Sequence, residues 1–214
     1  MHIKNIHWIV IEDGTKTADS VNRLLKRSNI PYAYFFAAKQ PKLLTKGWTQ
    51  RNEALEYLRK YYRNYEGHAV VYFADDDNAY DIRLFNSFIR NVKNVGVWPV
   101  GLVGGAAVEG PIVKEGRVVR WHAQFKPNRT FAIDMAGFGV SLKLIHSTRA
   151  SFGCQCINES PEDCFLLQLG ISRSDVEPFG YNIHHKDVLV WHVNTVKSTI
   201  FNKTNNGFDL EIEE

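Results

Sequence analysis

The sequence lacks long apolar runs, a strong charge of one sign, internal repeats and flexible linkers. No apolar stretch approaches the roughly 20 residues that a transmembrane helix needs, so no membrane span is predicted within the printed sequence. The net charge of +3 is small and dispersed, whereas nucleic-acid-binding proteins concentrate lysine and arginine on one face. With 214 residues, 44% of them hydrophobic, the chain is long enough for a sizeable core. We predict one domain over residues 1–214 and no nucleic-acid partner.

Cysteine is also scarce, and all three cysteines lie within eleven positions. Cys154 and Cys156 form a C-x-C pair, and Cys164 follows after a seven-residue gap. A zinc site could take these residues with His184 or His185 as the fourth ligand, but the spacing is not typical of zinc. Local thiols or a disulfide are the other interpretation, and the spacing favours it.

Apolar runs alternate with amphipathic segments in the first half of the chain. The predicted strands are "HWIVIED" (7–13), "YAYFFA" (32–37) and "AVVYFA" (69–74). A helix follows each of them: one with Ala18, Val21, Leu24 and Leu25 on its apolar stripe, one over 49–65 and one over 80–92. This alternation predicts an α/β fold with a largely parallel central sheet flanked by helices.

The second half consists of shorter strand-like pieces separated by turns that contain glycine or proline. These pieces lie at 95–105, 117–125, 131–142 and 187–193, with a short helix near 162–169. We therefore expect a nucleotide-binding half over about 1–94 and a mixed half over about 95–214 within one compact unit.

Three consecutive aspartates, Asp75, Asp76 and Asp77, follow the third predicted strand. In an extended chain Asp75 and Asp77 would share one face while Asp76 points away. Ligands of open α/β sheets bind at the carboxyl ends of strands, where this trio is expected. Crowded carboxylates raise one another's pKa unless a cation keeps them ionised, and oxygen ligands suit Mg²⁺, Mn²⁺ or Ca²⁺. The trio predicts a divalent cation site, with a solvated helix cap as the alternative.

Two cations, Lys46 and Arg51, flank the start of the helix predicted at 49–65. A helix start already carries positive partial charge, so cations there are mildly unfavourable and indicate a bound anion. Surface solubility is the alternative explanation. Together with the acidic trio, the two cations predict a diphosphate site.

Seven segments carry a resemblance to a known family: "HWIVIED", "TQRNEAL", "VVYFADDDNAY", "VWPVGLVGG", "FAIDMAGFGVSL", "NES" and "VLVWH". They occur in the order found in the β-1,3-glucuronyltransferases (glycosyltransferase family 43-like), which the chain resembles over about residues 7–194. The combination of "FADDDN" with "FAIDMAGF" is far more specific than a lone D-x-D motif. The resemblance implies a GT-A fold, Mn²⁺ as cofactor, a UDP-glucuronate donor and inverting β-1,3 transfer of glucuronic acid onto a galactose-terminated glycan.

The resemblance assigns the aspartates to the donor. Asp13 would hold the uracil, Asp75 and Asp76 would contact the ribose and the donor sugar, and Asp77 would bind Mn²⁺ directly. The metal would neutralise charge on the diphosphate as the glycosidic bond breaks. For Asp13 the alternative is a residue that simply ends a strand in a turn.

The resemblance also assigns the cations and one histidine to the donor. Arg51 would help hold the glucuronyl part, and His192 would line the pocket near the diphosphate, unless it is a hydrogen-bonded core histidine. Lys46 stands where the family usually has arginine, and it keeps the charge but lacks the planar guanidinium with its paired N–H donors. Asn194 stands where the family has another arginine and loses the charge. We expect weaker UDP binding, or compensation by Lys197.

On the acceptor side Glu109, Arg129 and Asp134 match family positions that hydrogen-bond the acceptor or the donor sugar. Glu159, in "NES", matches the general base, which would take the proton of the acceptor hydroxyl during a single inverting displacement. Asp134 could instead satisfy a buried backbone donor. Pro161, close to Glu159, is equally typical of an ordinary helix start.

The resemblance further implies a homodimer and residence on the lumenal side of the Golgi membrane. Family members have an additional strand before "HWIVIED" whose Pro-Thr-Tyr turn stacks a tyrosine on uracil. The printed sequence begins with "MHIKNI" and shows neither that strand nor a membrane anchor. The alternative hypothesis is therefore a catalytically inactive relative that binds glycans or proteins. Another metal-dependent enzyme of phosphate chemistry is a third.

Overall fold

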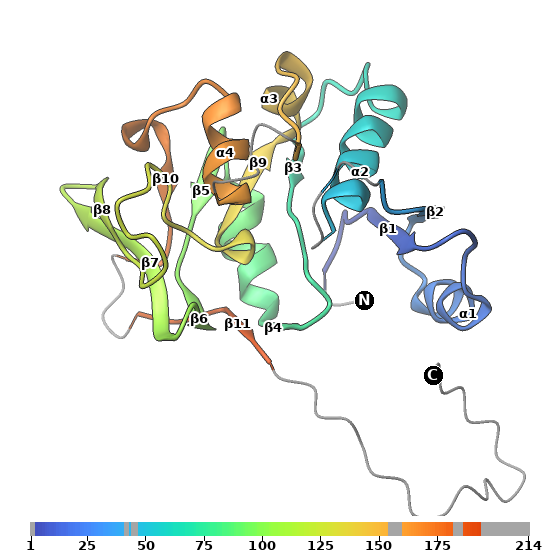
Figure 1. The fold of residues 1–214 in the computed structure, drawn as a ribbon, viewed down its shortest axis with the longest axis horizontal. Coiled ribbons are helices and arrows are strands. Elements are labelled where there is room, and N and C mark those ends of the chain that lie inside the picture. Colours follow the sequence, from blue (N-terminus) through green and yellow to red (C-terminus); the bar gives the residue numbers. More distant parts are fainter. Residues whose placement is uncertain (1–2, 41–42, 44–46, 154–159, 182–185, 194–214) are drawn as a thin grey trace, which may run out of the picture.

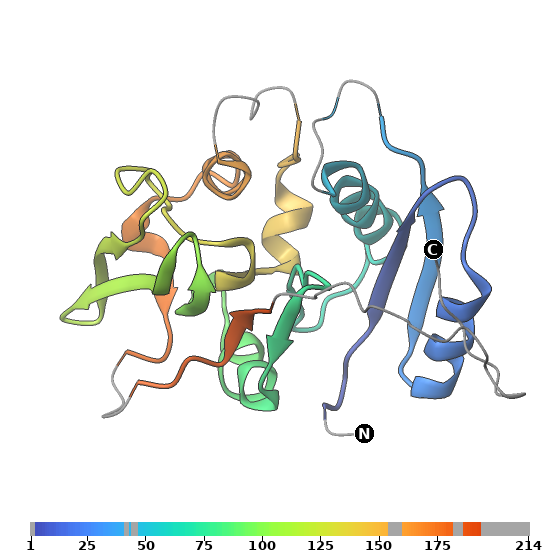
Figure 2. The same cartoon turned by 60° about the horizontal axis from the view of Figure 1, so that its bottom comes forward.

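The first part of the chain builds a two-stranded parallel sheet with one helix on each face. The computed structural model describes residues 3–40, 43, 47–153, 160–181 and 186–193 (Figure 1). Strand β1 (Trp8–Asp13) pairs in parallel with β2 (Tyr32–Ala37), which confirms both strand predictions. Helix α1 (Asp19–Ser28) covers one face and helix α2 (Trp48–Tyr61) covers the other (Figure 2).

The buried stripe of helix α1 is narrower than the sequence predicts. Asn29 follows the helix in the left-handed conformation, with φ 55°, which asparagine tolerates better than most residues. Leu25 is 1% exposed, whereas Leu24 is 55% exposed. Consecutive helical residues point about 100° apart, so Leu24 falls outside the core face that the pattern assigned to it.

The remaining strands form two mixed sheets in which both halves of the chain take part. The strand orders are β10–β5–β9–β3 and β4–β11–β6–β7–β8. The strand bounds are Val70–Val71 (β3), Asn78–Tyr80 (β4), Val95–Val97 (β5), Val100–Val103 (β6), Ala106–Lys114 (β7), Arg117–His122 (β8), Phe138–Ser141 (β9), Glu177–Pro178 (β10) and Val190–His192 (β11). Since β3 pairs with β9 and β4 pairs with β11, the two halves share their sheets.

The described strands do not confirm a largely parallel central sheet. Parallel pairing joins β1 to β2, β5 to β10 and β6 to β11, and the other five pairs are antiparallel. Two of the five antiparallel pairs arise from tight turns with positive φ at both residues, Gly104–Gly105 between β6 and β7 and Glu115–Gly116 between β7 and β8. Two-residue turns of this kind produce antiparallel hairpins. Strand β7 was not predicted from the sequence.

Strand β3 is shorter than the predicted 69–74, and the two aromatic residues that follow it enter different cores. Tyr72 packs with the cluster around Trp98, and Phe73 lies edge-on to Phe165 in the other cluster, with ring centroids 5.7 Å apart. The helical segment after it is present as predicted but irregular, with a π-helical turn at Leu84–Phe88 and a 3₁₀ turn at Ile89–Asn91.

The larger core cluster joins α2 to the second half of the chain. Phe152 and Phe165 stack with centroids 4.7 Å apart, and Leu55 of α2 belongs to the same cluster. The smaller cluster surrounds Trp98, whose indole N–H donates to the Ala136 carbonyl (2.8 Å).

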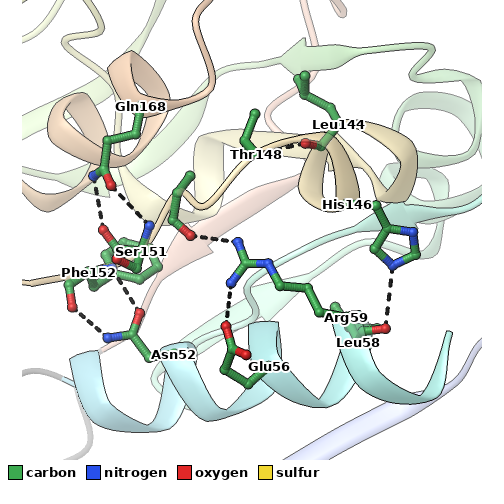
Figure 3. A network of polar contacts seen from close by, with 11 residues as sticks. Asn52, Glu56, Leu58, Arg59, Leu144, His146, Thr148, Ser151, Phe152 and Gln168 are labelled. Atoms are coloured by element: carbon green, nitrogen blue, oxygen red, sulfur yellow. Dashed lines mark hydrogen bonds and ion pairs between the residues drawn. The ribbon is translucent and has the colours of Figure 1, made fainter. Parts of the chain in front are cut away.

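Polar contacts fix α2 against the segment that precedes helix α4 (Pro161–Gln168) (Figure 3). The amide of Asn52 pairs with both the N–H and the carbonyl of Phe152, and Arg59 donates to the Ala150 carbonyl (2.8 Å). Gln168 of α4 pairs with both backbone groups of Ser151. Helix α3 (Leu142–Ser147) packs beside α2. Within the described ranges no helix has the length and apolar character to cross a bilayer.

Candidate functional site

The three aspartates lie in a turn between β3 and β4. Asp76 and Asp77 form the turn and are exposed, while Asp75 is partly buried. Because the chain turns here, strand alternation does not apply, and the prediction that Asp75 and Asp77 share one face is not confirmed. Strand β11 holds the far end of the turn, since the Val193 N–H donates to the Asp77 carbonyl (2.9 Å).

Arg51 links the first turns of α2 to the aspartates. Its guanidinium forms an ion pair with the Asp75 carboxylate and lies over the Phe152 ring, 5.9 Å from the centroid. Burial raises the pKa of Asp75 above its ordinary value of 3.8, and Arg51 opposes this shift without cancelling it. Because the pKa of this carboxylate stays raised beside Arg51, a second cation would further stabilise its charged form.

Asp13 lies at the carboxyl end of β1, beside the same helix start. Gln50 donates from Nε2 to Asp13 Oδ1 (2.9 Å) and to the Ala37 carbonyl (3.0 Å). Since Ala37 ends β2, this side chain of α2 spans the carboxyl ends of both strands. Gln50 and Arg51 are consecutive residues, so one helical turn contacts both Asp13 and Asp75.

The start of α2 offers hydrogen-bond donors. The helix has no side-chain cap at Gly47 and no acidic residue in its first turn. The indole N–H of Trp48 is buried and has no hydrogen-bond partner in the described part of the chain. Free donors at a helix start suit an anion such as phosphate. Lys46, the other cation predicted here, lies outside the described residues.

His192, at the end of β11, pairs with Asp134. His192 Nε2 lies 3.2 Å from Asp134 Oδ1, and the two side chains are 28% and 17% exposed. Asp134 also accepts from the Ala136 N–H (2.9 Å) and so caps the 3₁₀ turn Met135–Gly137. The backbone role considered for Asp134 is therefore present together with a contact to the other predicted site residue.

A second polar cluster lies at the start of α4, where Arg129 meets Ser160 and Glu162. Arg129 donates to the Ser160 hydroxyl, which donates to the Glu162 carboxylate. The closest Arg129 nitrogen and Glu162 oxygen are 3.7 Å apart, and the side chains are 9% and 15% exposed. Burial raises the pKa of Glu162 above its ordinary value of 4.5, although Ser160 and Arg129 both lower it.

Asp134 connects the two clusters electrostatically. Its charge raises the pKa of Asp75 and also that of Glu162. Asp75 of the β3–β4 segment and Glu162 of α4 are thus both within the electrostatic range of Asp134.

Glu109 is more enclosed than an acceptor-binding role suggests. The residue is 4% exposed and its Oε1 accepts from the Gln124 N–H (2.7 Å). Gly104 packs so closely that a Cβ there would lie 2.5 Å from the same oxygen. The next residue after Gln124 is Phe125, which is 55% exposed and lies under the Arg129 guanidinium at 5.4 Å. Glu109 thus supports the segment that presents Phe125 and Arg129.

A divalent metal fits this site only if the protein and the substrate both supply its ligands. Within the described ranges no group of three or more His, Cys, Asp or Glu side chains converges closely enough to enclose an ion. Asp77 nevertheless offers an exposed carboxylate at the tip of the turn. Hard divalent cations in nucleotide enzymes are often held by one or two carboxylates together with the phosphates of the substrate. Asp77 suits that arrangement.

Several predicted residues lie outside the described part of the chain. They are Lys46, Cys154, Cys156, Glu159, His184, His185, Asn194 and Lys197. Cys164 is disulfide-bonded, which favours the disulfide interpretation over zinc. Glu162 and Ser160 were missed as site residues, because a helix start after Pro161 accounts for them locally. Their burial against Arg129 is a tertiary effect without a local pattern.

Comparison with known proteins gives consistent matches. The family model described as "Glycosyltransferase family 43" matches residues 1–196 of the chain. Human galactosylgalactosylxylosylprotein 3-beta-glucuronosyltransferase 1 is 37% identical over 222 residues, 97% of this chain and 65% of that protein. The Caenorhabditis elegans protein sqv-8, of the same description, is 40% identical over 92% of this chain and 57% of its own length. The chain thus spans less than two thirds of these relatives.

Proposed function

Because the chain belongs to glycosyltransferase family 43, we propose that it transfers glucuronic acid from UDP-glucuronate to a terminal galactose of a glycan. The printed names of its relatives describe 3-beta-glucuronosyltransferases that act on a galactosylgalactosylxylosyl protein. The observation that supports the proposal most directly is a pair of contacts at the strand ends: Arg51 pairs with Asp75, and His192 Nε2 lies 3.2 Å from Asp134 Oδ1.

The donor would lie across the start of α2 and the β3–β4 turn, in a GT-A arrangement. Asp13 would bind the uracil, Asp75 and Asp76 the ribose and sugar, and Asp77 a Mn²⁺ ion that assists departure of the diphosphate. Lys46 and Arg51 would add positive charge beside the donor. His192 would line the donor pocket, oriented by its contact with Asp134.

We assign the general base to Glu162, with Glu159 as the alternative that the "NES" match implies. The carboxylate would take the proton from the acceptor hydroxyl while that oxygen bonds to the anomeric carbon. The bond from that carbon to the UDP oxygen breaks in the same displacement, which inverts the configuration. A raised pKa suits a general base, because the proton is held more tightly near working pH. Arg129 would orient the base and, with Phe125 and Glu109, frame the acceptor.

We also propose a lumenal Golgi location and a homodimer, in line with the family resemblance. The disulfide at Cys164 supports an oxidising compartment, because disulfides rarely persist in the cytosol.

The test is UDP release from UDP-glucuronate in the presence of a β-galactoside acceptor. We expect release that requires Mn²⁺ and is lost in Asp77→Ala. Asp81→Ala is a suitable control, because Asp81 is tied to the exposed Arg83 and not to the site. Undiminished release without Mn²⁺, or in Asp77→Ala, would contradict the proposal.

A catalytically silent binding module is the second candidate. One observation favours it: among the described strands β1 and β2 pair only with each other, so both outer edges of this small sheet at the donor site are unpaired. Binding of UDP and Mn²⁺ together, followed by no transfer, would support this candidate.

A further inference from the structure

The side chain of Asn78 is buried without hydrogen bonds. The residue is 9% exposed, and neither its amide nitrogen nor its amide oxygen has a partner in the described part of the chain. Buried polar groups in native proteins are almost always paired, so an amide with both ends unpaired calls for an explanation. No contact described above gives Asn78 a role in the free protein.

Asn78 lies between the acidic turn and His192. It follows Asp77 directly, opens β4 and lies opposite His192 on β11. Directly opposite residues of an antiparallel pair share one face of the sheet, so the side chains of Asn78 and His192 are neighbours. His192 in turn contacts Asp134.

Tyr80 connects the same face to Asp75. It lies two residues after Asn78 and donates from its hydroxyl to the Asp75 carbonyl (2.6 Å). Burial raises the pKa of Tyr80 to about 12, and a polar side-chain interaction with Asn78 lowers it, so the amide lies close to the phenol. The amide still falls short of hydrogen-bond geometry with it.

The chemistry of a carboxamide suits this position. Its N–H₂ can donate to a carboxylate such as Asp77 or Asp75, and its oxygen can accept from an imidazole N–H. The neighbouring turn, Asp76–Asp77, is exposed and can adjust, whereas Asn78 is held in the β4–β11 ladder. A movement of the turn that brings one of these carboxylates to the amide would give it a partner.

We propose that Asn78 is a positioning residue whose amide is unpaired in the free protein and becomes paired when the Asp75–Asp77 turn closes on a divalent cation and a nucleoside diphosphate. This inference rests on the proposed function, which supplies the two ligands. An unpaired buried amide destabilises the free form, and pairing it removes that penalty only in the loaded form. Asn78 therefore favours the loaded form and contributes to affinity.

The experiment compares thermal unfolding and ligand binding in wild type and Asn78→Leu. Leucine has the same number of side-chain heavy atoms and no polar group. We expect the melting temperature of the ligand-free variant to rise by about 2–4 °C. In calorimetric titrations of UDP with Mn²⁺ present, we expect its Kd to be about tenfold weaker or more. Asn78→Ala tests the same loss of affinity without the extra bulk of leucine, so poor folding of the leucine variant does not decide the outcome.

Asn52→Leu is the matched control. Its amide is fully used by the backbone of Phe152 (Figure 3), so the same substitution leaves two partners unpaired and should lower the melting temperature. If both Asn78 variants bind UDP and Mn²⁺ as tightly as wild type, the inference is wrong and the proposed function stands. If Asn78→Leu and Asn78→Ala both melt well below wild type, the amide is structural and the inference is also wrong. If wild type itself binds no UDP with Mn²⁺, both proposals fail.

Discussion

Glu162→Gln gives the sharpest test of the site. The substitution keeps the shape of the side chain and an oxygen that accepts from Ser160, but removes the charge and the ability to take a proton. If Glu162 is the general base, kcat should fall by about 10²–10⁴-fold. That corresponds to about 3–5 kcal/mol of barrier. Binding of UDP with Mn²⁺ should change little, because Glu162 belongs to the acceptor side.

The effect on stability should be small or favourable, in spite of the lost ion pair. At 3.7 Å and an effective dielectric constant near 20, the attraction between Glu162 and Arg129 is about 4 kcal/mol before desolvation is counted. The pKa of Glu162 is nevertheless raised, so the burial penalty on the charged form exceeds all favourable contacts together. A folded-state pKa above the unfolded value means that ionisation costs stability as pH rises through it. At pH 7 the neutral glutamine avoids that cost.

The assay combines steady-state UDP release, calorimetry with UDP and Mn²⁺, and thermal unfolding at pH 7. Glu56→Gln is the matched control, because it removes a helical Glu–Arg pair whose glutamate is 62% exposed (Figure 3). We expect the control to keep its activity. If Glu162→Gln retains near wild-type kcat while Glu159→Gln loses it, the base is Glu159 and the reasoning from burial is refuted.

Four further outcomes follow from the same contacts. The transfer rate should fall on acidification with a midpoint above pH 4.5, the ordinary Glu pKa, because Glu162 must be ionised to act as a base and burial raises its pKa. A pH–rate profile that shows no such fall above pH 4.5 would contradict this. Binding of UDP with Mn²⁺ should weaken on acidification from above the ordinary Asp value of 3.8, since Asp75 takes up its proton early; calorimetry at several pH values measures it. Arg51→Lys should weaken UDP-glucuronate binding in calorimetry, because lysine keeps the charge but lacks the planar guanidinium that pairs with Asp75. Unchanged affinity would show that Arg51 is not a donor-binding residue. Reduction of the Cys164 disulfide should lower stability by about 2–3 kcal/mol, the loop-closure value for the 8–10 residue spacing to Cys156 or Cys154. Thermal unfolding with and without reductant measures that loss, and an unchanged melting temperature would show that the cross-link is not structural.

Local patterns predicted much of the fold. The apolar runs at 7–13 and 32–37 became β1 and β2, because strand and helix periodicity depend on near neighbours. The helix predicted at 49–65 became α2 (Trp48–Tyr61), which ends four residues earlier than predicted. The direction of strand pairing was not predictable in the same way. For β6, β7 and β8 it depended on the positive-φ turns at Gly104–Gly105 and Glu115–Gly116, which the sequence showed only as glycine-containing breaks.

The candidate site likewise has features that the sequence predicted and features that only the structure shows. The acidic trio, Arg51 and the chain order of the family segments were fixed by sequence, because residue identity and order need no fold to be recognised. Only the tertiary structure decided that Arg51 meets Asp75, that His192 meets Asp134 and that Glu162 is buried beside Arg129. The physical reason is that charge, burial and unpaired polar groups such as Asn78 are properties of neighbours brought together from distant parts of the chain. No local pattern records which neighbours those are.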